Sequence, residues 1–574
     1  MGFRALTLLG CVLLLGCSRT GLPMQSLDSD TGGSPAPADQ AKTPNAPSDA
    51  PNPTPGVPSA AVPSAPVPTE PTASEALPEV CIATRIESGN RVPDGQSSSL
   101  VLVAPLAAQR GPFELAPQNL RGSAFSPHGK RFAFADDMGV FVIDRWPPQR
   151  AALGTGAAPR DVAWADDARL IVTTTTTIEL HDRELGTRET LREVAGSGDI
   201  PQFYIARPSP DGQWLAFAFA DASTGVHEVW LSKLSGSHET RRVYPLLPGS
   251  VVAWFDWAPN SEHLAFSVTG TNGRWLRPYS VSTKNDVIGA VAQISVPLGE
   301  NESVETFDFS PDGKWLHYFY ERVDPTTNES EFRLYVVDMS DGLPGPSVLV
   351  SSFTQRYWSS PGVWSPKSDQ IAFHAEFAGN GVLLSDEFVA KPSRFSTIPV
   401  KAHDGEFEQV LKQGWSPDGA ALYFTAMNSD QVERVYKSDP SRGKAVMLSK
   451  EANTRGLFLS SVPGCIAYSQ FVPRPAITIV KESTSSYIEV GQPEWNAPDW
   501  TGSFDSSYGM WVNDSSSLRG LLYLTNSISI GDTLAWVSVN DCVPQTSQVL
   551  IPGHAHQILG LPDVSTIDEW PFQK

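Results

Sequence analysis

The chain has 574 residues and a formal net charge of −21 at pH 7, because 63 aspartates and glutamates outnumber 42 lysines and arginines. This acidic balance argues against nucleic acid and anionic lipid as partners. The chain also contains no G-x-S-x-G string, which argues against a serine peptidase of the α/β-hydrolase type.

The first sixteen residues are predicted to be a secretory signal peptide. Arg4 supplies a positive charge, and the apolar run from Leu6 to Leu15 is too short to span a bilayer. The ending Leu14-Leu15-Gly16-Cys17 resembles the bacterial lipobox, whose cysteine is acylated with chains such as palmitate and becomes the mature N-terminus. The resemblance implies lipidation of Cys17, and Ser18 after it implies delivery to the outer membrane. A match ending at Cys11 and an ordinary cleaved signal are the alternatives.

Residues 17–80 form a segment of different composition, rich in Pro, Ala, Ser and Thr and without Phe, Trp or Tyr. Such a segment cannot bury enough apolar surface to fold, so we predict a disordered linker. Its expected role is to hold a folded domain, residues 81–574, away from the membrane.

A turn followed by an apolar strand recurs in that domain. One copy reads Ser209-Pro210-Asp211-Gly212, in which proline presets the turn, serine and aspartate bond nearby N–H groups, and glycine tolerates the turn's last conformation. The residues from Trp214 to Phe217 then have strand character. The six firm copies start at Phe125, Pro208, Trp257, Phe309, Trp364 and Trp415.

Weaker copies extend the array. Degenerate units lie near Val162 and Val462, and residues 518–539 are strand-like. Four-stranded units repeating at roughly 50 residues close into propellers. We therefore predict an all-β fold, a single β-propeller of seven or eight four-stranded blades.

The string S-P-D-G-x-x-[LI]-A-[FY] resembles the repeat of TolB-type (WD40-like) bacterial β-propellers, over roughly residues 120 to 470. The resemblance implies the propeller architecture and a setting in the cell envelope, where TolB-type propellers act with a peptidoglycan-associated partner. This chain differs in having a lipobox and a linker in place of a small α/β domain.

Three cysteines follow Cys17 in the chain, namely Cys81, Cys465 and Cys542. A secreted protein is expected to reach an oxidising compartment, where cysteines form disulfides. A Cys81–Cys542 disulfide would join the two ends of the propeller, where closing a long loop stabilises most in theory. Cys465–Cys542 is the competing pair.

Few residues have the spacing of a catalytic or metal site. The aspartates of the repeat, such as Asp312, are better interpreted as turn residues than as catalytic acids. His554 and His556 could face one side of a strand and bind zinc, or could be exposed loop residues. We predict no catalytic residue, cofactor or metal.

The chain also contains 16 tryptophans, among which two groups are of interest. Trp164, Trp257, Trp364 and Trp415 precede repeat turns and are expected to pack between blades. A second group, Trp495, Trp500 and Trp511, either fills gaps near the closing blade or forms a recognition surface.

The leading functional hypothesis is a lipid-anchored propeller of the outer membrane that binds or scaffolds an envelope protein or a cell-wall glycan. The alternative is a polysaccharide lyase or hydrolase with a site in the propeller channel. Similar repeats occur in oligogalacturonate lyases, but His554, His556 and scattered carboxylates are its only support in the sequence.

Overall fold

The computed structural model describes residues 75–76, 82–87, 98–103 and 113–115, and most of the chain from residue 120 to 560 with gaps between. The chain divides into two units, Gly21–Ser74 and the remainder. The described strands, which start at Glu75, belong to the second unit. The predicted signal peptide, Cys17, the linker as far as residue 74, and Cys81 lie outside the described residues. No helix in the described part is long and apolar enough to cross a membrane.

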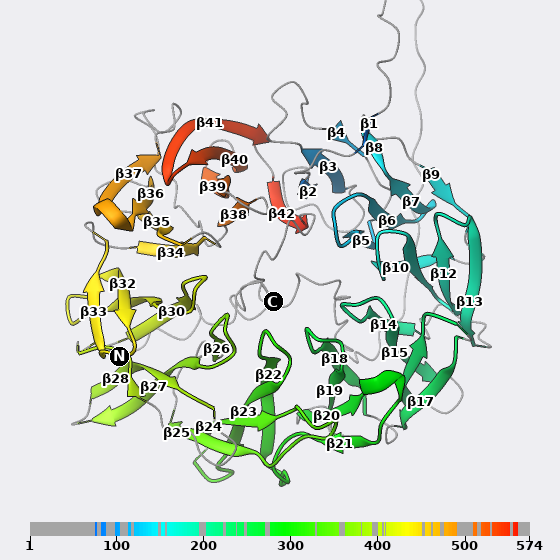
Figure 1. Cartoon of the computed structure of the whole chain (residues 1–574), viewed down its shortest axis with the longest axis horizontal. Coiled ribbons are helices and arrows are strands. Elements are labelled where there is room, and N and C mark those ends of the chain that lie inside the picture. Colours follow the sequence, from blue (N-terminus) through cyan, green and yellow to red (C-terminus); the bar gives the residue numbers. More distant parts are fainter. Residues whose placement is uncertain are drawn as a thin grey trace, which may run out of the picture. The chain divides into compact units, whose positions relative to one another are not determined.

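The described residues form ten four-stranded antiparallel sheets, arranged as blades around a common centre (Figure 1). The predicted all-β propeller is thereby confirmed, but the structure has ten such sheets where the repeats predicted seven or eight blades. The difference comes from the last blade, which lacks the turn signature, and from a blade assembled from both ends of the domain.

In each blade described below, the strand named first lies innermost in the ring and the strand named last lies outermost (Figure 1). Blade 1 contains β42 (Ala555–Gly560), β2 (Ile82–Glu87), β3 (Ser98–Val103) and β4 (Phe113–Glu114). Blade 2 contains β5 (Gly122–Phe125), β6 (Phe132–Asp136), β7 (Gly139–Ile143) and β9 (Ala151–Leu153). Blade 3 contains β10 (Pro159–Trp164), β11 (Arg169–Thr174), β12 (Thr177–Asp182) and β13 (Thr187–Glu193). Blade 4 contains β14 (Phe203–Pro208), β15 (Trp214–Asp221), β16 (Val226–Lys233) and β17 (Thr240–Pro245). Blade 5 contains β18 (Val252–Trp257), β19 (His263–Thr269), β20 (Leu276–Ser282) and β21 (Val291–Gln293).

The second half of the ring follows the same order. Blade 6 contains β22 (Glu302–Phe309), β23 (Trp315–Val323), β24 (Ser330–Asp338) and β25 (Val348–Thr354). Blade 7 contains β26 (Val363–Trp364), β27 (Ile371–Gly379), β28 (Val382–Ala390) and β29 (Val400–Lys401). Blade 8 contains β30 (Gln409–Trp415), β31 (Leu422–Met427), β32 (Glu433–Asp439) and β33 (Lys444–Met447). Blade 9 contains β34 (Thr454–Leu459), β35 (Cys465–Gln470), β36 (Ala476–Lys481) and β37 (Ser486–Val490). Blade 10 contains β38 (Gly509–Asn513), β39 (Leu518–Ser527), β40 (Gly531–Asn540) and β41 (Val543–Ile551). A separate two-stranded sheet pairs β1 (Glu75–Ala76) with β8 (Arg145–Trp146), and 3-10 turns span Lys284–Asp286 and Glu482–Thr484.

Backbone pairing closes the ring. Strand β42, from the C-terminal end of the domain, pairs antiparallel with β2 from its N-terminal end, with Arg85 opposite Gln557. The same strand contacts β40 of blade 10 and β5 of blade 2. The two ends of the domain are therefore held in one sheet.

The repeat turn has the predicted chemistry. In blade 4 the Ser209 hydroxyl donates to Asp211 Oδ1 at 2.6 Å and accepts from the N–H of Trp214 at 2.9 Å. The glycine that ends the turn has φ of 67° at Gly212 and 70° at Gly313. A side chain is disfavoured at such φ, which explains the glycine.

Two copies carry serine in place of that glycine. Ser261 and Ser368 keep a positive φ of 60°, and each serine hydroxyl accepts a hydrogen bond from the turn of the preceding blade. The donors are the N–H groups of Asp211 at 3.0 Å and Asp312 at 2.9 Å. The turns therefore join neighbouring blades as well as reversing the chain.

A second inter-blade contact uses tryptophan. In five of the described blades a tryptophan on the innermost strand donates its indole N–H to a backbone carbonyl of the preceding blade's innermost strand. The pairs are Trp164 to Ala124 (3.1 Å), Trp257 to Arg207 (3.0 Å), Trp364 to Asp308 (3.5 Å), Trp415 to Val363 (2.9 Å) and Trp511 to Phe458 (3.0 Å). The expected packing of the first four between blades is what the structure shows.

Candidate functional site

The innermost strands, which surround the centre of the ring, carry charged residues in blades 3 and 4. Asp161 on β10 lies 3.5 Å from Arg207 on β14, and both side chains are partly exposed. Gly122 on β5 makes room for Asp161, because a Cβ at Gly122 would lie 2.3 Å from Asp161 Oδ1. The arrangement presents a carboxylate and a guanidinium on adjacent blades.

Several innermost strands share a β-bulge, a device that re-aims side chains and often lies near functional sites. The register shifts between Pro159 and Asp161 in β10 and between Val304 and Thr306 in β22. The extra residue is Arg160 in one strand and Glu305 in the other. Similar polar positions in this region are the half-exposed Asp256 and Asp308.

Glu305 forms a carboxyl pair with Glu321 on the adjacent strand β23. Glu321 in turn accepts a hydrogen bond from the Ser330 hydroxyl at 2.6 Å. Surrounding protein, and then the charge and hydrogen bond of Glu321, raise the pKa of Glu305 to about 7, although its side chain retains contact with solvent. The pair can hold a proton near neutral pH.

We expect Glu305→Gln to stabilise the protein above pH 7 and to change it little at pH 4. A carboxyl whose pKa is raised by folding contributes stability below its unfolded pKa, and that contribution is lost as pH rises through the folded value near 7. Because the side chain is exposed and screened, the gain at pH 8 is on the order of 1 kcal/mol. Urea unfolding at the two pH values measures it, with the exposed Glu300→Gln as the control. An equal gain at both pH values would contradict the shared-proton assignment.

A buried ionic cluster lies on blade 3. The fully buried Glu179 carboxylate binds His181 Nε2 at 2.9 Å and Arg188 Nη2 at 2.6 Å, and it accepts from the Thr177 hydroxyl at 3.1 Å. Burial tends to raise the pKa of Glu179, but the hydrogen bonds from His181 and Arg188 leave it below its ordinary value. These partners satisfy the carboxylate and fix its place in the sheet. The cluster was not predicted from the sequence, although the alternation of Glu179 and His181 on one strand face is a signal for it.

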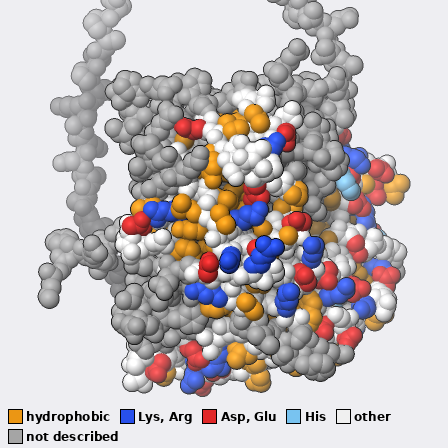
Figure 2. All heavy atoms as spheres, turned by 60° about the vertical axis from the view of Figure 1, so that its left-hand side comes forward, with side chains coloured by type: hydrophobic (Ala, Val, Ile, Leu, Met, Phe, Trp, Pro, Cys, Tyr) orange, Lys and Arg blue, Asp and Glu red, His pale blue; other side chains and the backbone are white. Residues whose placement is uncertain are grey.

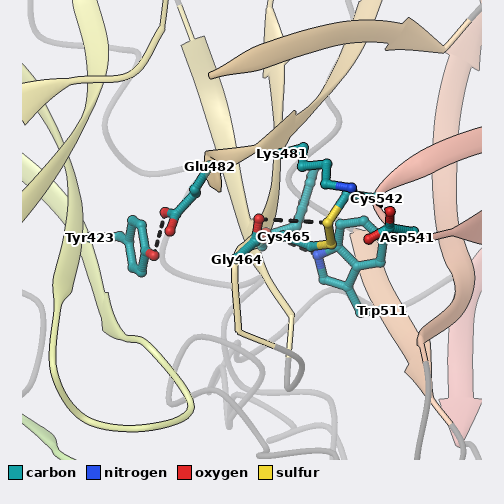
Figure 3. The surroundings of a disulfide bond; sticks show 9 residues. Tyr423, Gly464, Cys465, Lys481, Glu482, Trp511, Asp541 and Cys542 are labelled. Atoms are coloured by element: carbon teal, nitrogen blue, oxygen red, sulfur yellow. Dashed lines mark hydrogen bonds and ion pairs between the residues drawn. A yellow bond between two sulfur atoms is a disulfide. The ribbon is translucent and has the colours of Figure 1, made fainter. Parts of the chain in front are cut away.

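The disulfide joins blade 9 to blade 10 (Figure 3). Cys465 opens β35 and Cys542 lies in the turn between β40 and β41, with 5.5 Å between their Cα atoms. The predicted Cys81–Cys542 bond is therefore wrong, and the competing pair is formed. The physical reason is that pairing of β2 with β42 already joins the ends of the domain, while Cys465 and Cys542 face each other across a blade seam.

Polar contacts continue along these seams. The Tyr423 hydroxyl of blade 8 donates to Glu482 of blade 9, and Lys481 pairs with Asp541 of blade 10 (Figure 3). Lys437 also binds Glu482, at 2.6 Å. Burial and the hydrogen bond to Glu482 raise the pKa of Tyr423, which keeps this phenol protonated as a donor.

Of the second tryptophan group, Trp511 fills a gap. It is 4% exposed and packs in one cluster with Cys465 and Cys542. The gap-filling interpretation is thus confirmed for Trp511, while Trp495 and Trp500 lie outside the described residues.

The histidines considered as metal ligands cannot be placed in a site. His554 lies outside the described residues, as does the side chain of His556 on β42. Among the side chains that are described, no three His, Cys, Asp or Glu residues are grouped to hold a metal ion.

No protein-family model matches the chain, and no curated protein matches it. Solved structures match at low identity. Dipeptidyl peptidase 4 of Porphyromonas gingivalis is 11% identical over 71% of this chain and 65% of its own, with a TM-score of 0.41. The Dos1 propeller is 11% identical over 61% and 89%, with a TM-score of 0.33. TolB from Acinetobacter baumannii is 12% identical over 58% and 79%, with a TM-score of 0.26. The likeness extends to the propeller fold and no further.

Proposed function

We propose that this propeller is a binding module of the bacterial cell envelope, anchored by lipid in the outer membrane, and that its ligand is an envelope protein. The observation that carries the proposal is that the polar groups of the repeat turns form hydrogen bonds within the fold. Asp211, Ser261, Asp312 and Ser368 bond to their own or adjacent turns, so these polar groups stabilise the fold. Recognition on such a framework is expected to lie in the loops and edges that the repeat does not share.

Exposed apolar side chains support a protein ligand. Val400, Val446 and Met447 lie on the outermost strands of blades 7 and 8 and are 55%, 63% and 50% exposed. Val446 and Met447 are neighbours on one strand, and exposed apolar residues that lie together are a candidate protein contact site. The lyase or hydrolase alternative depended on His554, His556 and scattered carboxylates. Both histidine side chains lie outside the described residues and add no support to it, so we do not propose it.

The proposal is tested by cross-linking the full-length chain in intact envelopes and identifying the covalent partners. We expect to identify the same envelope protein in replicate preparations. That protein should no longer be cross-linked when the envelopes are denatured before the cross-linker is added. Recovery of no reproducible protein would overturn the proposal.

The anchor gives a separate prediction. We expect Cys17→Ala to abolish incorporation of a fatty-acid label and to release the protein from stable membrane association, because the acyl chains supply that anchoring. Cys11→Ala is the matched control, since Cys11 ends the rival match, and it should keep the label. Labelling that persists in Cys17→Ala and disappears in Cys11→Ala would move the site to Cys11.

A further inference from the structure

Several outermost strands carry an exposed apolar residue, among them Leu349 on β25, Val400 on β29 and Val543 on β41, and β33 of blade 8 carries two that are adjacent. The four residues of β33 include Val446 and Met447, which are 63% and 50% exposed. On β13 of blade 3, by contrast, Arg188, Glu189, Arg192 and Glu193 occupy most of the strand. Charged side chains on an edge strand discourage pairing with another chain, so β13 is protected and β33 is less so.

Strand β33 is the last strand of its sheet among the described residues. In the described part of the chain β33 pairs with β32 alone, with Lys437 opposite Val446 and Tyr436 opposite Met447. The outward N–H and C=O groups of such a strand can accept a further strand. An added strand gains its affinity from main-chain hydrogen bonds and its specificity from alternate side chains.

Positively charged residues lie on this edge and on the neighbouring outermost strand. Lys444 on β33 is exposed, and the Arg442 side chain, 78% exposed, forms an ion pair with Asp439 at 3.2 Å. Lys401 lies on β29 of the neighbouring blade. Figure 2 shows this side of the molecule, where Lys and Arg side chains lie near the middle of the face among hydrophobic, Asp and Glu side chains.

The net charge of the whole chain is negative, whereas the lysine and arginine side chains at this edge are positive. With a net charge of −21, a second copy of the protein would be repelled as it approached. A segment bearing carboxylates would instead be attracted to the lysines and arginine around β33. Because successive strand residues point to opposite faces, Lys444 and Val446 share one face of β33 and Met447 lies on the other. Carboxylates on one face of an added strand would then meet Lys444, and apolar residues on its other face would cover Met447.

We propose that β33 is a docking strand for an extended, acidic peptide segment of a partner protein, with alternating carboxylate and apolar side chains, which adds to blade 8 as a fifth strand. This inference rests on the proposed function and names the surface and the chemistry of the ligand. Open backbone groups favour a peptide over an anionic membrane, because lipid headgroups gain nothing from a strand edge.

The test uses a fluorescein-labelled peptide of alternating glutamate and valine and the full folded chain, followed by fluorescence anisotropy. We expect saturable binding that weakens with added salt, and a loss of affinity of about tenfold or more in Val446→Asp and in Lys444→Glu. Leu185→Asp, at a 75% exposed position in the β12–β13 turn, should bind as the original protein does. A peptide N-methylated at alternate residues should fail to bind, because it lacks the pairing N–H groups.

Each other outcome overturns the docking strand. Equal binding by Val446→Asp or by the N-methylated peptide would place the peptide elsewhere or exclude strand addition. Binding to anionic phospholipid vesicles that Val446→Asp abolishes, with no peptide binding, would make the edge a membrane contact. Sedimentation of a Val446-dependent dimer without peptide would make it a self-association edge.

The envelope experiment separates this inference from the proposed function. If the original protein and Val446→Asp cross-link to the same partner equally well, the docking strand is wrong and the binding function stands. If neither captures a reproducible partner, the proposed function fails. Thermal unfolding of the original protein and of Val446→Asp checks that this substitution at an exposed position leaves the fold intact.

Discussion

Replacing Cys542 with serine is expected to lower the free energy of unfolding by about 2–5 kcal/mol under oxidising conditions. The disulfide closes a segment with a sequence separation of 77, so its loss restores much conformational freedom to the unfolded chain. It also leaves a buried thiol at Cys465 against Trp511 in the seam between blades 9 and 10. Urea unfolding followed by tryptophan fluorescence measures the loss.

Two controls make the disulfide experiment specific. Cys81→Ser should leave the unfolding free energy close to that of the original protein, since Cys542 is already bonded to Cys465. Adding reductant should lower the stability of the original protein and leave Cys542→Ser unchanged. A loss in Cys81→Ser equal to that in Cys542→Ser would show that the bond joins Cys81 instead.

Removal of the Glu179 carboxylate is expected to cost about 1–3 kcal/mol in Glu179→Ala, because its buried partner His181 loses its acceptor while the Arg188 side chain, 41% exposed, keeps contact with water. The carboxylate is fully buried, and its loss leaves His181 and Arg188 without their common acceptor. The nearby Glu184 lies exposed in the β12–β13 turn, so Glu184→Ala should stay within about 0.5 kcal/mol of the original protein.

The effect of Glu179 should depend on pH in a definite direction. Its folded pKa lies below the ordinary value, so its contribution is present above the unfolded pKa of about 4.3 and is lost as pH falls through the folded value. The difference between the original protein and Glu179→Ala should therefore be full at pH 7 and shrink below about pH 4. A difference that grew on acidification would contradict an ionised Glu179.

The propeller class could be predicted from local chemistry. Proline, aspartate and glycine in the turn starting at Ser209, followed by the apolar strand from Trp214, indicate a hairpin that cannot bury its own face. Six such units leave an array of blades as the stable solution. The number of blades could not be predicted in the same way. Blade 10 has no repeat turn, and blade 1 takes β42 from one end of the domain and β2 from the other.

The turn and strand chemistry can be predicted from the sequence, because it depends on neighbours within one repeat. Which groups outside the repeat pattern meet follows only from the folded ring. Cys465 and Cys542 are brought together by adjacent blades, while within blade 6 a bulge in β22 brings Glu305 to Glu321 on β23. Such pairs are set by strand register and ring closure, which involve residues far apart in the chain, so no local pattern specifies them.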